Sequence, residues 1–160
     1  LAPLAASVQE KLIAQTEYLI NLDGSVSDAE ADALEQTRAI VEQINALTPD
    51  DAGSTEMIFG APPSYWLDLR NYDPVVAAAA LDLPLLILQG ERDYQVTVAD
   101  DLARWQAGLA DREDVTVQTY PGLNHLFMFG EGAPNPDEYN AAGHVSEDVI
   151  DAIAAWVKGM

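Results

Sequence analysis

The sequence predicts an α/β fold in which two parallel strands, at about 84–90 and 115–120, are flanked by helices. Three observations indicate this class. The first run is short, almost wholly apolar and bounded by turn residues, as in a strand buried on both faces. The second run, Val-Thr-Val-Gln-Thr-Tyr, alternates and is rich in β-branched side chains. A helical pattern lies between them, and strand, helix, strand is the order of a right-handed parallel unit.

The region before the first strand is expected to be helical. Residues 4–22 place apolar side chains on one face, which predicts an amphipathic helix that ends at Asp23-Gly24. Ser27, with Glu30 three residues later, forms a capping box at the start of a second helix that runs to about Leu47. Two helices joined by a short turn make a helical hairpin.

Two shorter helices are expected before the first strand. Residues 60–75 mix proline with aromatic side chains and leave room for one short helix, and an alanine-rich helix follows from Val75 to Leu81. We therefore divide the chain into a helical cap and connecting segment, 1–80, and an α/β core, 81–160.

The rest of the core is predicted from caps and turns. Thr97 and Asp100 open a helix that runs to about Leu109, and a loop rich in glycine and proline covers 130–143. Ser146 caps the last helix, whose apolar stripe comprises Val149, Ile150, Ile153, Trp156 and Val157. Two strands make a small sheet, so we expect another chain or missing upstream strands to complete it.

The charge of the chain excludes several kinds of partner. It has 27 acidic and 7 basic residues and a formal net charge of −20. Nucleic acids and anionic membrane surfaces attract basic patches, so neither is expected to bind. No apolar run is long enough to span a bilayer. There is no cysteine, which excludes disulfides and thiolate metal sites.

The composition also bears on the cellular location. The first residues lack the charged start and long apolar stretch of a signal peptide. There is no initiator Met, which fits an internal piece of a longer protein or a trimmed chain. We expect a cytoplasmic protein from a host with a salty cytoplasm, although secretion of the parent protein stays open. An ordinary acidic soluble protein is the alternative.

Two polar side chains follow the predicted strands at the edge where parallel sheets bind ligands. Asp93 lies in the loop after the first strand and His125 in the loop after the second. Adjacent strands lie about 4.8 Å apart, so the carboxylate can reach the imidazole. An acid that orients a histidine is the second half of a Ser-His-acid catalytic triad.

The same region resembles the C-terminal half of an α/β-hydrolase. Gly90-Glu91-Arg92-Asp93 matches the G-x-x-D loop of that superfamily, and Gly122-Leu123-Asn124-His125 matches its G-x-x-H loop. A final amphipathic helix follows, and the likeness covers about 82–158. It is strongest to esterase-type serine hydrolases, including dienelactone-hydrolase-like and prolyl-oligopeptidase-like members. Residues 1–80 resemble the cap helices of such enzymes.

The chain departs from this family in lacking the nucleophile motif. The superfamily carries its serine in G-x-S-x-G, and the triad follows in the order Ser, acid, His. None of the six serines lies in that motif: Ser7, Ser25, Ser27, Ser54, Ser64 and Ser146. The oxyanion-hole loop expected near the start of the fold is also missing. We therefore expect the chain to correspond to the back half of a hydrolase and to be inactive alone.

Other residues are also candidates for the site. Glu91 competes with Asp93 as the acid, although a solvated turn explains it more simply. His144 fits a surface or helix-start position. Tyr65 and Trp66 either line an acyl pocket or pack the cap. Acidic pairs such as Asp100-Asp101 fit solvated faces better than a metal site.

The resemblance implies a serine hydrolase acting on a small acyl or ester substrate, with Asp93 and His125 in its triad and no cofactor. The nucleophile would come from a missing N-terminal half or a second chain. The alternative is a non-catalytic α/β module that completes its sheet by self-association or with another chain. A receiver-like phospho-acceptor domain fits poorly, because no lysine follows a late strand other than Lys158 near the chain end.

The net charge predicts that salt stabilises the fold. Self-repulsion among exposed carboxylates opposes the compact state, and roughly 1 M salt shortens the Debye length to about 3 Å. We expect the melting temperature to rise with KCl between about 0.1 and 3 M. A melting temperature that stays constant over that range of KCl would contradict adaptation to a salty cytoplasm.

Overall fold

The structure, a computed structural model, describes residues 3–70 and 72–159, which form two compact units. The helical unit is Ser7–Asp73. The sheet unit takes in the described residues of 1–6 and 74–160. The division expected at residue 80, between a helical cap and an α/β core, stays a prediction about domains.

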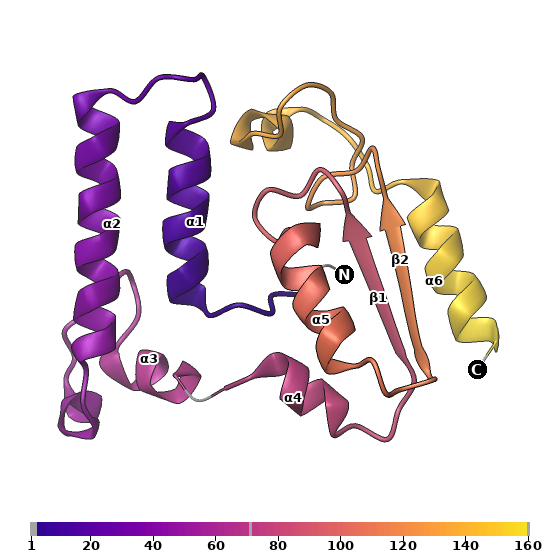
Figure 1. Ribbon diagram of the computed structural model, residues 1–160, viewed down its shortest axis with the longest axis horizontal. Helices are drawn as coiled ribbons and strands as arrows, with labels where there is room; N and C mark the ends of the chain where they lie inside the picture. The colour runs from indigo at the N-terminus through magenta and orange to yellow at the C-terminus, as the bar shows by residue number, and fades with distance from the viewer. Residues whose placement is uncertain (1–2, 71, 160) are drawn as a thin grey trace. The chain divides into compact units, whose positions relative to one another are not determined.

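The helical unit contains the expected hairpin, made of α1 (Val8–Ile20) and α2 (Asp28–Ala46) (Figure 1). The capping box of α2 is confirmed: the Ser27 hydroxyl accepts from the backbone of Glu30, whose carboxylate accepts the Ser27 N–H at 2.8 Å. The first helix, expected from residue 4, begins later. Ser7 and Glu10 form a second capping box there, which fixes the start of α1.

The carboxyl end of α2 is capped by an arginine from another segment. The chain continues through η1 (Pro49–Gly53) and α3 (Pro63–Leu69). Arg70, which follows α3, donates through its guanidinium to the carbonyls of Leu47 at 2.7 Å and Ile44 at 2.9 Å. A cation suits this position because the last carbonyls of a helix lack intrahelical partners. The same region packs Ile44, Ile58 and Trp66 into the core of the helical unit.

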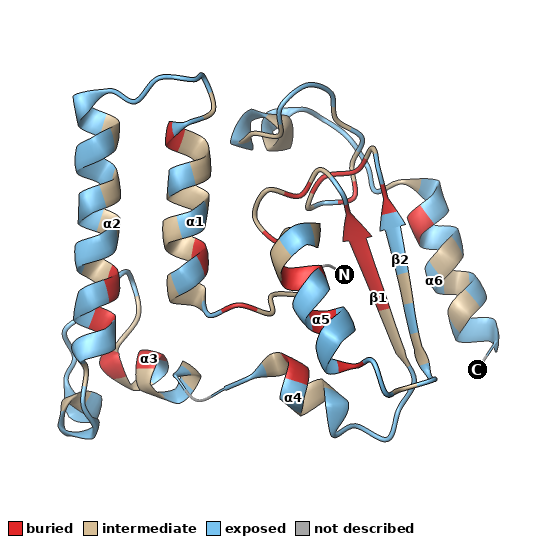
Figure 2. Ribbon diagram, in the orientation of Figure 1, coloured by how far each residue is buried: buried red, intermediate tan, exposed pale blue. Residues whose placement is uncertain are grey.

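The sheet unit contains the two expected strands, β1 (Leu85–Gly90) and β2 (Val115–Tyr120). They pair in parallel, with Leu85 opposite Val115 and Gly90 opposite Tyr120. The two strands therefore end side by side, which confirms the expected parallel pair. Figure 2 shows that burial along β1 increases towards this carboxyl end.

Side chains of β1 alternate between two small cores. Ile87 packs with Leu102 and Trp105 on one face, against α5 (Ala103–Gly108). Leu88 packs with Phe127 and Val149 on the other face, against α6 (Glu147–Gly159). The two helices thus cover opposite faces of the pair, as the continuous apolar run predicts.

The helix expected from Thr97 to Leu109 begins with a wider turn. Residues Val98–Leu102 (η2) form a π-helical turn before α5. The solvated face expected for Asp101 is wrong, since this residue is 0 % exposed. Its carboxylate accepts backbone N–H groups from Ala5, Ala6 and Thr97. This buried acceptor holds the first described residues in the sheet unit.

Two further short helices complete the sheet unit. The alanine-rich helix is α4 (Pro74–Ala79), and the loop after β2 contains η3 (Pro136–Asn140). On α6, much of the predicted apolar stripe is exposed, including Ile150, Ile153 and Val157. Among the described residues, no helix has the length and apolar character needed to cross a bilayer.

Gly90 is required where β1 ends. A Cβ at this position would lie 2.4 Å from the carbonyl oxygen of Leu123 and 2.6 Å from that of Asn124. We expect Gly90→Ala to lower the free energy of unfolding by about 2 kcal/mol, because the crowded atoms belong to backbone and must shift. Urea denaturation measures the change.

Gly53→Ala is the matched control, since nothing lies within 4 Å of a Cβ there. Its stability should stay within about 0.5 kcal/mol of the parent chain. Equal stability of the two variants would show that the close approach at Gly90 is unimportant.

Candidate active site

The loops after β1 and β2 bring Asp93 and His125 into contact. His125 Nδ1 lies 2.7 Å from Asp93 Oδ2, although the two residues are 32 positions apart in the sequence. The contact follows from the parallel register, because Gly90 and Tyr120 end their strands as paired neighbours. The two loops at this edge of the sheet therefore form the acid–histidine pair that the sequence predicted to be within reach.

Backbone hydrogen bonds join the two loops beside this pair. The N–H of Glu91 donates to the carbonyl of Tyr120 at 2.9 Å, and the N–H of Arg92 donates to the carbonyl of Leu123 at 3.0 Å. These bonds continue the strand pairing beyond the last residues of the ladder. As a result, the backbone that carries Asp93 is fixed relative to the backbone that carries His125.

The carboxylate of Asp93 is fully buried, with a side-chain exposure of 0 %. Its Oδ1 accepts the backbone N–H groups of Gln95 and Val96, both at 2.9 Å. Its Oδ2 faces His125, and the amide of Gln89 lies 3.5 Å away. A buried carboxylate needs hydrogen-bond donors to offset its lost solvation, and the loop supplies them to Asp93.

His125 is more open than its partner, with 34 % of its side chain exposed. The hydrogen bond to Asp93 raises the pKa of His125 above its ordinary value, partial burial opposes this, and the negative charge of Asp93 adds to the rise. In the neutral ring, a proton on Nδ1 donates to Asp93 and leaves Nε2 as the free base. This is the tautomer that a general base requires.

Of the other candidates for the site, Glu91 forms no hydrogen bond with the acid–histidine pair among the described residues, and Tyr65 and Trp66 belong to the helical unit. Glu91 is exposed and accepts a hydrogen bond from the Thr119 hydroxyl at 2.6 Å. In the helical unit, Tyr65 is exposed, whereas Trp66 is buried and donates its indole N–H to the carbonyl of Ile58 at 3.0 Å. Trp66 thus packs the unit it belongs to, and a role of either ring in an acyl pocket stays a prediction.

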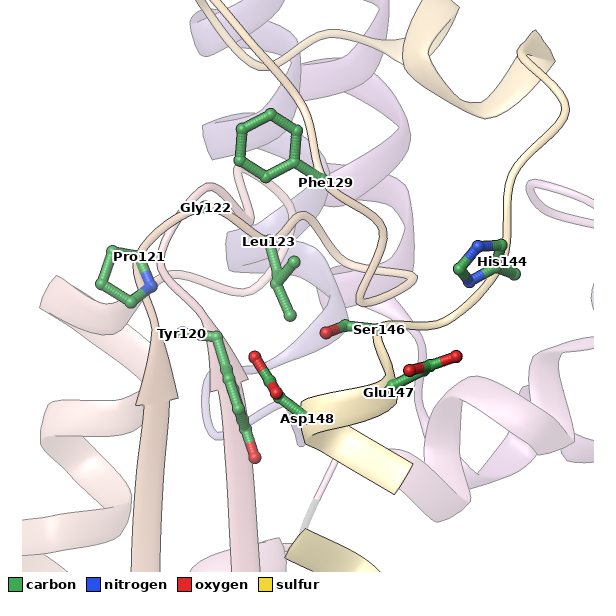
Figure 3. Close-up of a pocket in the computed structure, with 9 residues that line it drawn as sticks. All are labelled: Tyr120, Pro121, Gly122, Leu123, Phe129, His144, Ser146, Glu147 and Asp148. Atoms are coloured by element: carbon green, nitrogen blue, oxygen red, sulfur yellow. The ribbon is translucent and has the colours of Figure 1, made fainter. Parts of the chain in front are cut away.

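A separate hollow of about 540 Å³ lies beside the end of β2 and the start of α6 (Figure 3). His144 and Ser146 line it, but Asp93 and His125 do not. His144 is exposed, and its Nδ1 lies 3.1 Å from the carbonyl of Val145. Within the described residues no hydrogen bond joins Ser146 to His144, so the hollow contains no second Ser-His pair.

Neither a nucleophile nor a metal site accompanies the pair in the part of the chain that the structure describes. No serine hydroxyl hydrogen-bonds to His125 within the described residues. No group of three or more histidine, aspartate or glutamate side chains among them is arranged to hold a metal ion. The site as described is therefore an oriented base with one free ring nitrogen.

Sequence reasoning missed several polar residues around the pair. Gln89, 1 % exposed, donates to the carbonyls of Gly90 and Val96 and so shapes the acid loop. Tyr139, in the loop expected to be irregular, accepts a hydrogen bond from Gln95 at 3.0 Å. The signal for Gln89 was present, since it is a polar residue that ends an apolar strand. Nothing in the local pattern marks Tyr139.

Comparison with known proteins shows a similarity to an esterase. Over 159 residues, 98 % of its length, the chain is 39 % identical to the esterase EstD of Thermotoga maritima. The matched part is 36 % of EstD, so the chain spans about a third of the length of this curated relative. No protein-family model matches the chain, and no solved structure matches it.

The pKa of His125 predicts a pH-dependent contribution to stability. Because the pKa is raised in the folded state, the charged pair with Asp93 stabilises the fold fully below about pH 6.5 and loses this effect as pH rises through the raised value. The difference in unfolding free energy between the parent chain and His125→Gln should therefore be larger at about pH 5.5 than at about pH 9. Urea denaturation at both pH values measures it.

His144→Gln serves as the matched control, because His144 has no carboxylate partner among the hydrogen bonds of the described residues. The change with pH should be smaller for His144→Gln than for His125→Gln. A His125→Gln effect that is equal at both values would argue against the charged pair.

Proposed function

We propose that this chain provides the acid and the general base of a serine hydrolase that cleaves carboxylic esters or related acyl bonds. The observation that carries the proposal is the 2.7 Å contact between His125 Nδ1 and a fully buried Asp93 carboxylate, at the carboxyl edge of a parallel strand pair. The similarity of nearly the whole chain to an esterase supports the same class of reaction.

The chemistry assigned to the pair is that of a triad. Nε2 of His125 removes the proton from a serine hydroxyl as the serine attacks the acyl carbon, and the ring then gives this proton to the leaving oxygen. Asp93 holds the ring in the required tautomer and stabilises the imidazolium while it exists. In the second half of the reaction, water attacks the acyl-enzyme while His125 takes the proton of the water. The ring returns this proton to the serine, and the acid product is released. No cofactor takes part in these steps.

The nucleophile and the oxyanion donors are assigned to a part of the parent protein outside this chain. The match to about a third of an esterase and the absence of G-x-S-x-G from the sequence support this assignment. The parallel pair, the G-x-x-D and G-x-x-H loops and the final helix fit the C-terminal part of an α/β-hydrolase fold. The 160-residue chain alone is then inactive.

A non-catalytic assembly module is the second candidate function. It is favoured by the exposed side chains of Ile150, Ile153 and Val157 on α6 and by a sheet of only two strands among the described residues. Such a surface favours association with another chain or a second copy. Labelling by a fluorophosphonate probe combined with light scattering separates the candidates: a stable dimer without labelling, even after the rest of the hydrolase is added, favours assembly alone.

A chimeric enzyme tests the hydrolase proposal. The chain replaces the segment of EstD that it matches, and hydrolysis of p-nitrophenyl acetate is measured for the chimera and for the chain alone. We expect turnover by the chimera and background rates for the chain. His125→Ala in the chimera should lower kcat by at least about 10³-fold, because it removes the general base.

The second histidine provides the control. His144→Ala changes the same type of side chain outside the acid–histidine pair and should leave kcat within about twofold. Near-full activity of His125→Ala, or a burst of acyl-enzyme from the chain alone, would refute the assigned roles.

A further inference from the structure

One carboxylate binds the residues that directly precede Asp93 and His125. Glu138, in η3, forms an ion pair with the guanidinium of Arg92 through Oε1. Its Oε2 accepts a hydrogen bond from the side-chain amide of Asn124 at 3.1 Å. Arg92 precedes Asp93, and Asn124 precedes His125, so a third segment joins the two loops of the site.

This contact is shielded from solvent. The side chains of Arg92 and Glu138 are 14 % and 12 % exposed, and Asn124 is 1 % exposed. The guanidinium also donates to the carbonyls of Gly132 at 2.5 Å and Glu131 at 3.2 Å. Removal of one partner would leave the other charge buried and uncompensated, which favours the contact in the folded protein.

Asn124 connects Glu138 to the histidine loop by hydrogen bonds. Its side-chain oxygen accepts the backbone N–H groups of Leu126 at 3.0 Å and Met128 at 3.1 Å. Between them, Phe127 has a φ of 55°, a left-handed conformation that costs energy in a residue other than glycine. The amide nitrogen of Asn124 is the group left to reach outside the loop, and Glu138 accepts from it.

Space for this contact depends on Gly130. A Cβ at this position would lie 2.8 Å from Glu138 Oε2 and 2.9 Å from the guanidinium of Arg92. The next residue of η3 adds a second connection, since the Tyr139 hydroxyl accepts from Gln95, whose own N–H donates to Asp93. Glu138 and Tyr139 of η3 thus both contact the acid loop.

We propose that Glu138 is a positioning residue that holds His125 in hydrogen-bonding contact with Asp93 by binding the residue before each of them. Its catalytic meaning rests on the proposed hydrolase function, whereas its effect on the pair itself does not. Glu138 acts through Arg92 and Asn124 and touches no reacting atom. Loss of the carboxylate removes this side-chain connection between the loops, whereas the strand pair and the backbone hydrogen bonds beside it remain.

The test is made by NMR on the 160-residue chain, which needs no turnover. The low-field proton of His125 Nδ1 reports its hydrogen bond to Asp93, and its absence in His125→Gln assigns it. In Glu138→Gln we expect this signal to weaken and the pKa of His125 to fall towards 6.5. Asp93 is the group that raises this pKa, and Tyr139 faces the backbone of His125.

Two further variants test whether the effect of Glu138→Gln comes from the position of Glu138, from the lost charge or from unfolding. Glu131→Gln removes the same charge from the same loop, at an exposed side chain, and should keep the signal. Gly130→Ala keeps every charge but crowds Glu138 and Arg92, and it should weaken the signal as Glu138→Gln does. If Glu138→Gln unfolds, as circular dichroism would show, the result for Gly130→Ala decides. An unchanged signal in the folded variant, or equal loss in Glu131→Gln, would overturn the proposal.

The chimeric enzyme gives the catalytic readout. Misplacement of a base by about 1 Å costs on the order of 10²-fold in rate, so Glu138→Gln should lower kcat by about 10- to 100-fold and change KM by less than about threefold. A change confined to KM would overturn the positioning role. If the chimera shows no turnover at all while the NMR result holds, the hydrolase proposal fails and the positioning of His125 stands.

Discussion

The buried carboxylate of Asp93 is the group on which the arrangement of the site depends. A charged group without solvent contact is stable only if its oxygens are supplied with donors, and here two backbone N–H groups and His125 supply them. The loop after β1 must therefore curl around Oδ1, and the histidine ring must present Nδ1 to Oδ2. With Nδ1 facing Oδ2, Nε2 is the ring nitrogen that points away from the acid.

Carboxylates perform the same task at two more places in the sheet unit. Asp101 accepts N–H groups from Ala5 and Ala6, 96 and 95 positions earlier in the chain, and Glu138 joins Arg92 to Asn124. The strand pair has only two small apolar cores, so apolar packing alone leaves the loops weakly held. In a chain with a net charge of −20, part of the acidic content thus serves as internal hydrogen-bond acceptors rather than as solvated surface.

Periodicity and capping patterns predicted the strands, their parallel order and the start of α2, because these features depend on neighbouring residues. The contact between Asp93 and His125 was also within reach, since parallel register places both loops at one edge. The roles of Asp101 and Glu138 could not be predicted from the sequence. An acid in a loop has the same local sequence pattern whether water or a distant N–H group solvates it. The late start of α1 has a similar cause: the residues before Ser7 are held by Asp101, and the apolar pattern alone extends the helix too far.

The two kinds of acid respond differently to salt. Ion pairs such as Arg38–Glu17 and Arg104–Asp100 have nearly half of each side chain exposed, so dissolved ions screen them and also screen the repulsion among exposed carboxylates. Asp93 and Glu138 are shielded by protein atoms, where counter-ions do not reach. Concentrated salt thus weakens the long-range repulsion of the surface without weakening the contacts that orient His125. A strongly acidic surface and an acid-built site are therefore compatible in one small unit, since burial separates the carboxylates that order the loops from those that carry the net charge.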